Sequence, residues 1–200
     1  MSNSLSSIIV KSVKNVYKGF FQVDQVFFDQ KRFNGEVMEN VKREVFKRKP
    51  VVFLSLYDPK LDKHLLTEQV RIGAIVNTPE KPLVIEPIAG IIDEGETCFE
   101  AALREAEEET GVLEFVDVES LELVFEGYTS AGGSNEYAYF IAGIFDSSNY
   151  KEQIGGVEGE HEDIRSHLIS SKEALDMISS GKLNSMASVV GVQWHLLQNK

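Results

Sequence analysis

The segment Gly90–Val112 constrains the fold more than any other part of this chain. Thr97 and Glu100 have the spacing of a helix capping box, and Gly111 is a good helix stop. The apolar residues at helical spacing between them are Phe99, Ala102, Leu103 and Ala106. The pattern therefore predicts a helix from Thr97 to Thr110 whose apolar face is pinned to a sheet.

The second half of this helix carries glutamates at Glu105, Glu107, Glu108 and Glu109. Like charges three or four residues apart destabilise a helix by roughly 0.2–0.5 kcal/mol per pair, so something should offset the repulsion. Glu105, Glu108 and Glu109 share one helix face, whereas Glu107 points elsewhere. Three carboxylates on one face suit Mg²⁺ or Mn²⁺, which prefer oxygen ligands. The alternative is a solvated acidic face, which is what most such runs are.

The loop before the helix contains Gly90 and Gly95, which allow it to fold tightly against the helix start. Glu96 and Arg104 carry opposite charges on the two sides of this loop, so we expect them to pair and lock it. The loop and the helix together are predicted to form a rigid holder for a divalent metal ion.

The N-terminal third is rich in Val, Ile and Phe with partial alternation, which is typical of strands. The predicted strands lie at residues 7–13, 19–30 and 36–48. Asn34-Gly35 between the second and third runs is a strong hairpin signal. We expect residues 1–48 to form a strand unit that precedes a larger domain at residues 49–200.

In the larger domain, the apolar run at residues 50–59 predicts a buried strand. Further strands are expected at residues 61–74, 82–90, 120–130, 136–146 and 164–170, and further helices at residues 171–181 and 185–198. Residues 155–163 are polar, acidic and rich in glycine, and predict a loop. This order indicates an α/β fold, with a mixed sheet sandwiched between helices.

The amino-acid composition limits the classes of protein to which the chain can belong. The chain has 200 residues, 42% of them apolar, and a net charge of −12, so a nucleic-acid surface is not expected. A single cysteine excludes an intramolecular disulfide and fits a reducing compartment. No window approaches 18 uncharged apolar residues and the start does not read as a signal peptide, so we expect a soluble cytoplasmic protein without a membrane span.

The spacing Gly90-x5-Glu96-x7-Arg104-Glu105-Ala106-x-Glu108-Glu109-x-Gly111-Val112 resembles the Nudix box, with every fixed position filled. The resemblance implies an α/β/α sandwich. It also implies hydrolysis of a nucleoside diphosphate linked to another moiety, with Mg²⁺, or Mn²⁺ as a substitute, and two or more ions per site. The metal contacts that it implies are Ala89, Glu105, Glu108, Glu109 and Glu162, with Arg104 and Glu108 in the catalytic set.

Other stretches resemble the bacterial ADP-ribose pyrophosphatases, from about Tyr17 to Trp194. These are YKGFF, FNG, REVFKR, TEQVRIGA, SAGGSNE, GEHEDIR and ASVVGVQW. The resemblance implies hydrolysis of ADP-ribose to AMP and ribose 5-phosphate. It also implies a homodimer, built with the help of the N-terminal strands, whose substrate site spans both subunits.

The same resemblance assigns roles to single residues. Phe20 matches an aromatic residue that stacks on adenine, and its alternative is an ordinary strand core residue. Arg43 and Arg71 match arginines that contact the substrate, although Arg71 could equally form a surface salt bridge. Glu160 matches the general base, on a loop that could also be merely solvated. The remaining substrate contacts implied are Gly132, Gly133 and Glu136.

One position departs from the family pattern. The usual turn is Ser-Pro-Gly-Gly, with the proline a marker of ADP-ribose specificity, and Ala131 replaces that proline here. Another nucleoside diphosphate sugar, such as GDP-mannose, therefore remains an alternative substrate. A binding module that does not cleave ADP-ribose is a second alternative, but such modules typically lose box carboxylates, and this chain keeps all of them.

Overall fold

The computed structural model describes residues 8–198, which fall into two compact units. The first unit comprises the described part of the chain up to Lys49 together with Tyr128–Tyr137. The second comprises Pro50–Gly127 and the described residues from Ala138 onward. A short hairpin from the middle of the chain is therefore part of the N-terminal unit.

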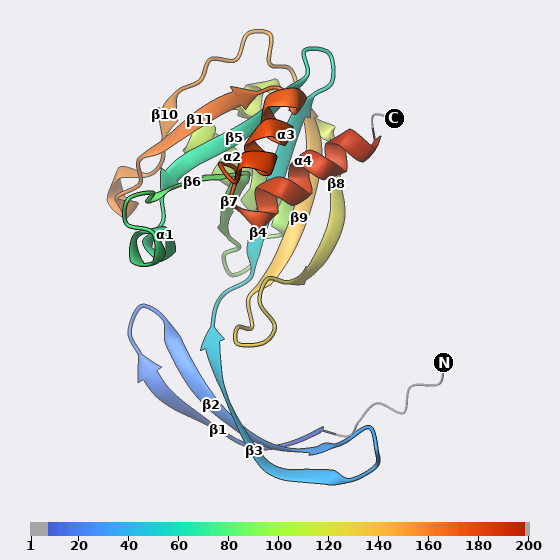
Figure 1. Ribbon diagram of the computed structural model, residues 1–200. Helices are drawn as coiled ribbons and strands as arrows, with labels where there is room; N and C mark the ends of the chain where they lie inside the picture. The colour runs from blue at the N-terminus through green and yellow to red at the C-terminus, as the bar shows by residue number, and fades with distance from the viewer. Residues whose placement is uncertain (1–7, 199–200) are drawn as a thin grey trace. The chain divides into compact units, whose positions relative to one another are not determined.

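The N-terminal unit is a three-stranded antiparallel sheet in the order β1-β2-β3, drawn in blue in Figure 1. Its strands are β1 (Ile8–Lys18), β2 (Gln22–Lys31) and β3 (Val37–Lys47). The predicted hairpin turn is confirmed: Gly35 has φ 93°, and Asn34 Oδ1 accepts a hydrogen bond from the Glu36 amide at 3.1 Å. Every residue of β1 is exposed within the chain, so this sheet has no core of its own.

The larger unit is built on an eight-stranded sheet. Its strands are β4 (Val51–Asp58), β5 (Lys63–Val70), β6 (Leu83–Glu86), β7 (Ile88–Ile91), β8 (Val116–Tyr128), β9 (Tyr137–Phe145), β10 (Ile154–Gly155) and β11 (Ile164–Ile169). The main order is β10-β11-β5-β4-β9-β8, with β6 paired to β5 and β7 paired to β4. Because β4 runs parallel to β9 and antiparallel to β5, the predicted mixed sheet is confirmed.

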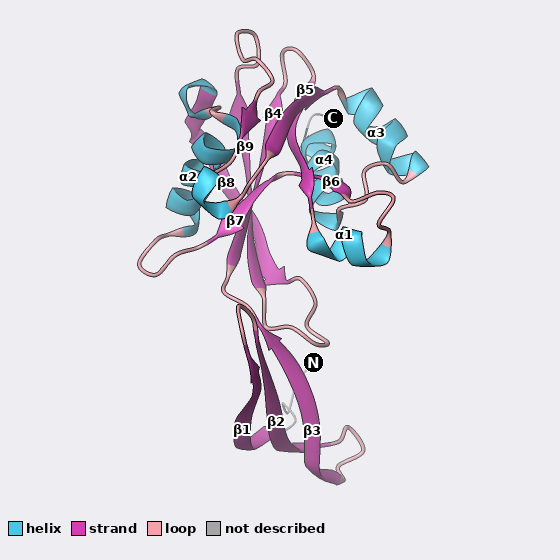
Figure 2. Ribbon diagram, turned by 90° about the vertical axis from the view of Figure 1, so that its left-hand side faces the viewer, coloured by secondary structure: helices cyan, strands magenta, loops and turns pink. Residues whose placement is uncertain are grey.

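Helices cover both faces of this sheet (Figure 2). α2 (Cys98–Thr110) lies on one side, and α3 (Ser171–Ser180) and α4 (Met186–Gln198) lie on the other. The remaining helical pieces are α1 (Ile72–Asn77), η1 (Leu113–Phe115) and η2 (Glu158–Glu160). Within residues 8–198, no helix is long and apolar enough to cross a membrane.

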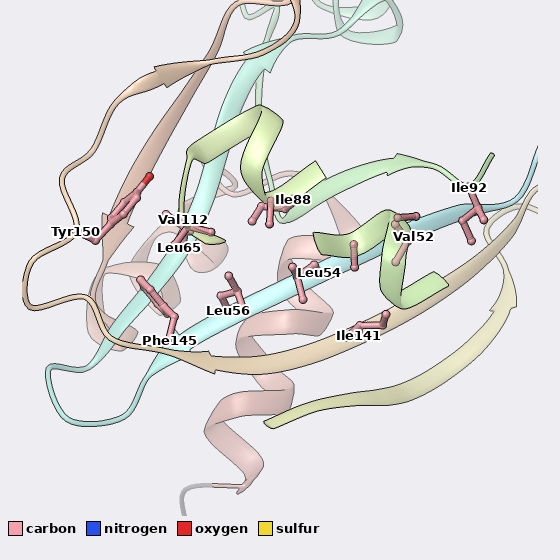
Figure 3. Packing of buried hydrophobic residues seen from close by; sticks show 13 residues of the cluster. Val52, Leu54, Leu56, Leu65, Ile88, Ile92, Val112, Ile141, Phe145 and Tyr150 are labelled. Carbon is pink, nitrogen blue, oxygen red and sulfur yellow. The ribbon is translucent and has the colours of Figure 1, made fainter. Parts of the chain in front are cut away.

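Two clusters of buried side chains attach the helices to the sheet. Val52, Leu54 and Leu56 of β4 pack with Ile141 of β9 beneath α2 (Figure 3). The second cluster lies under α3 and α4 and contains Leu66, Ile85, Met177 and Val192, among others. Helices on both faces bury β4 on both sides, which explains why its sequence is apolar at nearly every position.

The structure corrects several predicted elements. The strand expected to reach Ala74 ends at Val70, because the antiparallel strands β5 and β6 need a connection and α1 forms part of it. The run predicted at residues 82–90 breaks at Pro87, which has no backbone N–H for a ladder. The predicted acidic loop contains η2 and the last residue of β10. Phe99, expected on the buried helix face, is 36% exposed.

Candidate active site

The helix α2 begins and ends where its sequence predicts. Thr97 Oγ1 accepts a hydrogen bond from the Glu100 amide at 3.2 Å, and the Glu100 carboxylate accepts one from the Thr97 amide at 2.8 Å. Gly111 ends the helix in the left-handed region at φ 57°. Ala102 and Ala106 are fully buried, so the helix is fixed to the sheet along that side.

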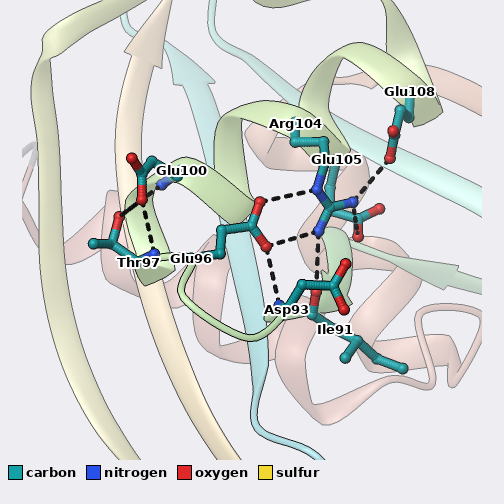
Figure 4. Close-up of polar contacts among 8 residues, drawn as sticks. All are labelled: Ile91, Asp93, Glu96, Thr97, Glu100, Arg104, Glu105 and Glu108. Carbon is teal, nitrogen blue, oxygen red and sulfur yellow. Dashed lines mark hydrogen bonds and ion pairs between the residues drawn. The ribbon is translucent and has the colours of Figure 1, made fainter.

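Arg104 is the centre of the polar contacts on this helix (Figure 4). Its Nε and Nη2 donate to the two carboxylate oxygens of Glu96 at 2.9 and 3.1 Å, so the predicted pair across the loop is confirmed. Its Nη1 donates to Glu105 at 2.7 Å and to Glu108 at 2.9 Å. Its Nη2 also reaches the Ile91 carbonyl at 3.0 Å. The hydrogen bond from Arg104 lowers the pKa of Glu96, and these carboxylates in turn raise the pKa of Arg104.

Glu105 and Glu109 are carboxylates held away from water. Glu109 is 2% exposed, and burial together with the charge of Glu105 raises its pKa to about 8. Burial raises the pKa of Glu105 to about 6, despite the hydrogen bond from Arg104. The Ala89 amide donates to Glu109 Oε2 at 3.3 Å. Burial of two carboxylates on one helix face disfavours their charged forms, and a bound cation would offset this effect.

Glu162 joins this group from a different part of the chain. Its charge raises the pKa values of both Glu105 and Glu109, so it faces the same side of α2. Its carboxylate accepts a hydrogen bond from the Val157 amide at 3.2 Å, which closes the segment that carries η2. Glu160 lies in η2 and is exposed.

The donor set fits a divalent cation such as Mg²⁺, since it consists of carboxylate oxygens from two segments beside the Ala89 backbone. Within residues 8–198, however, no three acidic, His or Cys side chains surround one point. Glu105 and Glu108 both turn toward Arg104 (Figure 4). The structure thus brings the predicted ligands together on one face but directs two of them to a guanidinium.

Arg71, a predicted substrate contact, precedes α1 and is tied to Glu86. Its Nε donates to Glu86 Oε2 at 2.6 Å, and its charge partly offsets the rise in the pKa of Glu109. Arg71 therefore forms a salt bridge, as the alternative interpretation of this residue predicted. It also lies near the carboxylates of α2. Glu86 was missed by the sequence analysis, because its only signal is an acidic residue at the end of a short apolar run.

Phe20 and Arg43 lie in the N-terminal unit. Phe20 is 91% exposed and meets Phe21 edge-on at 4.8 Å, so its alternative interpretation as a core residue is wrong. Arg43 is exposed on β3, where its Nη1 donates to the Lys42 carbonyl at 2.8 Å. The family resemblance predicts that Phe20 and Arg43 share one substrate site with Arg71 and the metal ligands. Such a site would contain residues of both units, and it stays a prediction.

Gly132, Gly133 and Glu136 belong to the hairpin loop of the N-terminal unit. The Gly133 carbonyl accepts a hydrogen bond from the Phe46 amide at 2.8 Å, which attaches the loop to β3. Glu136 accepts from Arg48 Nε at 2.8 Å and from Thr129 Oγ1 at 2.9 Å. Arg48 also lies over the Phe21 ring at 4.8 Å, and the sequence offered no signal for this contact.

A loop and helix that gather carboxylates around one arginine, on a mixed sheet between helices, are typical of a metal-dependent hydrolase. The NUDIX domain profile matches residues 47–188, and the chain belongs to this family of hydrolases. Nudix hydrolases generally use divalent metal ions.

Relatives are similar over nearly the whole chain. An ADP-ribose pyrophosphatase of Escherichia coli (strain K12) is 36% identical over 187 residues, which is 94% of this chain and 87% of that protein. One from Haemophilus influenzae is 35% identical over 194 residues, covering 96% and 87%. A GDP-mannose pyrophosphatase of Pectobacterium atrosepticum is 31% identical over 195 residues, covering 96% of each. A solved structure described as an ADP compounds hydrolase has a TM-score of 0.69 at 20% identity over 98% of each chain, which supports the fold.

Proposed function

We propose that this protein hydrolyses the diphosphate of ADP-ribose to AMP and ribose 5-phosphate, using Mg²⁺, with Mn²⁺ as a substitute and two or more ions per site. The observation that carries the hydrolase is the group of carboxylates on one face of α2, in which Glu109 is 2% exposed and Glu105 and Glu108 are both bound by Arg104. The substrate is supported by relatives named ADP-ribose pyrophosphatases at 35–36% identity.

The ions would be held by Glu105, Glu108, Glu109 and Glu162, with a further contact at Ala89. A divalent cation there supplies positive charge to the diphosphate oxygens while charge develops in the transition state. Without metal, Arg104 Nη1 holds Glu105 and Glu108 in place by donating a hydrogen bond to each carboxylate.

Glu160 is proposed as the general base. In this proposal Glu160 removes a proton from the attacking water as the new O–P bond forms. One P–O bond of the diphosphate bridge breaks, and the bridging oxygen leaves with the departing phosphate. Its exposed position in η2 supports this role, because a surface segment next to Glu162 can close over bound substrate.

The substrate contacts are proposed to come from Phe20, Arg43, Arg71, Gly132, Gly133 and Glu136. In this arrangement Phe20 stacks on the adenine, and the arginines bind phosphate oxygens. The high exposure of Phe20 supports stacking, because no other side chain of the described chain covers more than a small part of it. The ligand is a small nucleoside diphosphate sugar, and neither nucleic acid nor membrane is expected as a partner.

We further propose a homodimer whose N-terminal unit, residues 1–48, pairs with a second copy, while residues 49–200 form the hydrolase domain. Exposed apolar side chains on β1 support this proposal, since such a patch on a single chain is a typical interaction surface. They are Ile8, Ile9, Val10, Val13 and Val16. A cytoplasmic location is proposed from the single free cysteine.

The test is release of AMP from ADP-ribose with Mg²⁺, measured for the wild type and Glu108→Gln, with GDP-mannose in parallel. We expect rapid AMP formation by the wild type and a loss of roughly 100-fold or more in the variant, since bound metal contributes several kcal/mol to the transition state. Glu107→Gln, an exposed neighbour on the same helix, is the matched control and should retain activity.

The parallel substrate distinguishes the alternatives. Faster turnover of GDP-mannose would keep the mechanism and change the substrate, an outcome that Ala131 and the 31% identical relative make worth testing. Binding of ADP-ribose without turnover of either compound would overturn the enzyme and favour a binding module.

A further inference from the structure

A pair of buried hydroxyls, Tyr150 and Ser166, lies at the C-terminal end of α2. Tyr150 Oη is 2.9 Å from the Thr110 carbonyl and 2.8 Å from Ser166 Oγ. Tyr150 is 6% exposed, and Ser166 and Thr110 are fully buried. The Tyr150 ring is held edge-on against Phe115 and Phe145, at 5.7 and 6.3 Å (Figure 3 shows it beside Phe145).

Tyr150 Oη carries one proton, which it can donate to the Thr110 carbonyl or to Ser166 Oγ. Ser166 Oγ accepts a hydrogen bond from the Gln153 amide at 2.8 Å and lies 3.2 Å from the Gln153 carbonyl, to which it can donate. The two hydroxyls therefore link the last carbonyl of α2 to the backbone of Gln153.

The carbonyls at the C-terminal end of α2 require hydrogen-bond donors from outside the helix. The last carbonyls of a helix have no partner within it and carry partial negative charge. The last turn of α2 contains no basic residue, and Glu108 adds to the negative charge. The donors instead come from outside the helix: Tyr150 and Gln153 Nε2 reach the Thr110 carbonyl, and the Gly156 amide reaches the Glu108 carbonyl at 2.7 Å.

All of these donors lie on the segment that leads into the acidic loop. Gly155 passes so close to α2 that a Cβ there would lie 2.2 Å from the Glu109 carbonyl oxygen. A few residues later the same segment carries Glu160 and Glu162. The end of the helix that bears Glu108 and Glu109 is therefore joined directly to the segment that bears the other proposed ligand and the base.

We infer that Tyr150 and Ser166 are positioning residues, which hold the metal-binding end of α2 and the segment with Glu160 and Glu162 in register. Both act through the backbone of α2 and of the segment after Tyr150. The inference rests on the proposed function for its effect on turnover, but the attachment itself can be measured without any substrate.

The experiment compares Tyr150→Phe and Ser166→Ala with a matched control, Tyr57→Phe. Tyr57 is 7% exposed and donates to Asp62 at 3.0 Å, so its variant also loses one buried hydroxyl while keeping its ring. Three quantities are measured: Mn²⁺ binding without substrate, hydrogen exchange at the Gly156 amide, and kcat and KM for ADP-ribose.

In Tyr150→Phe and Ser166→Ala we expect Mn²⁺ affinity to fall roughly threefold to tenfold, the range that loss of one buried hydrogen bond produces. Exchange at Gly156 should accelerate, and kcat should fall while KM stays near the wild-type value. Tyr57→Phe should lose thermal stability to a similar degree with none of these changes.

The inference is overturned if the test variants lose stability like Tyr57→Phe but keep wild-type Mn²⁺ affinity and Gly156 exchange. If Tyr150→Phe fails to fold, Ser166→Ala decides alone. Failure of the proposed function has a different signature: the wild type itself would not release AMP, while the Mn²⁺ and exchange measurements would still report on the attachment.

Discussion

Gly90 and Glu105 lie so close together that a Cβ at Gly90 would be 1.8 Å from Glu105 Oε1. The glycine leaves the space that this carboxylate occupies beside the backbone of β7. The helix side chain and the strand backbone are thus fitted to each other, and a methyl group at residue 90 must displace the carboxylate.

Gly90→Ala is therefore expected to damage metal binding more than folding. We expect Mn²⁺ affinity and kcat to fall roughly 10–100-fold, the range seen when the surroundings of a metal ligand are disturbed. Titration with Mn²⁺ and steady-state kinetics measure this. The control is Gly127→Ala, where an added Cβ meets no atom within 4 Å, and wild-type values are expected. Normal affinity in Gly90→Ala would mean that Glu105 is not a ligand.

Arg104→Gln is expected to destabilise the protein in the absence of metal by roughly 1–3 kcal/mol, the cost of leaving charged hydrogen-bond partners unsatisfied. Glu96, Glu105 and Glu108 each lose a charged donor. Added Mg²⁺ should restore more stability to the variant than to the wild type, because it replaces part of the missing positive charge. Thermal unfolding with and without Mg²⁺ is the measurement.

The control for this experiment is Arg32→Gln, which removes a 3.4 Å surface pair with Glu36. Exposed ion pairs contribute roughly 0–1 kcal/mol, so its melting curves should hardly change. An equal effect of Mg²⁺ on Arg104→Gln and wild type would contradict the role of Arg104 as a counter-charge.

His64 should make stability fall as the pH is lowered. It is 1% exposed, its Nδ1 has no hydrogen-bond partner, and burial lowers its pKa to about 4. Below pH 6.5, about the ordinary pKa of histidine, His64 binds a proton in the unfolded chain but not in the folded protein. Stability is then present above pH 6.5 and declines toward pH 4, by on the order of 3 kcal/mol in total.

Urea unfolding of the wild type and His64→Gln at pH 7 and pH 5 measures this effect. The variant is needed because the raised pKa values of Glu105 and Glu109 act in the opposite direction over an overlapping range. His195 packs nearby, with ring centroids 5.8 Å apart, and burial lowers its pKa as well, so part of the slope should survive in the variant. An unchanged slope would contradict the assignment to His64.

Phe20→Ala is expected to weaken substrate binding without changing stability. The ring is 91% exposed, so the folded chain loses little by its removal. Stacking on a base contributes roughly 1–3 kcal/mol, so KM for ADP-ribose should rise about tenfold or more with kcat retained. Phe33→Ala, another fully exposed phenylalanine of the N-terminal unit, is the control and should leave KM unchanged. Equal KM values for both variants would remove Phe20 from the site.

The elements that the sequence predicted well are those whose signals are local. The helix α2 has both of its caps and its periodicity within one short segment, and the Glu96–Arg104 pair lies within the same stretch. By contrast α1 has no capping side chain and no buried residue, so nothing in its sequence distinguished it from the strand before it.

The parts of the site that the sequence could not predict depend on contacts between distant segments. Tyr150 and Thr110 are forty residues apart, and Arg48 and Glu136 are eighty-eight apart. A tyrosine in a polar stretch carries no mark of the carbonyl that it will reach. Only the fold brings these partners together.

Arg104 gives the proposed metal site an unusual starting point, because its guanidinium already binds Glu105 and Glu108. Uptake of a divalent ion is then an exchange of one positive charge for another at the same oxygens. The energy of the broken ion pairs is subtracted from the affinity for metal and is recovered when the ion leaves.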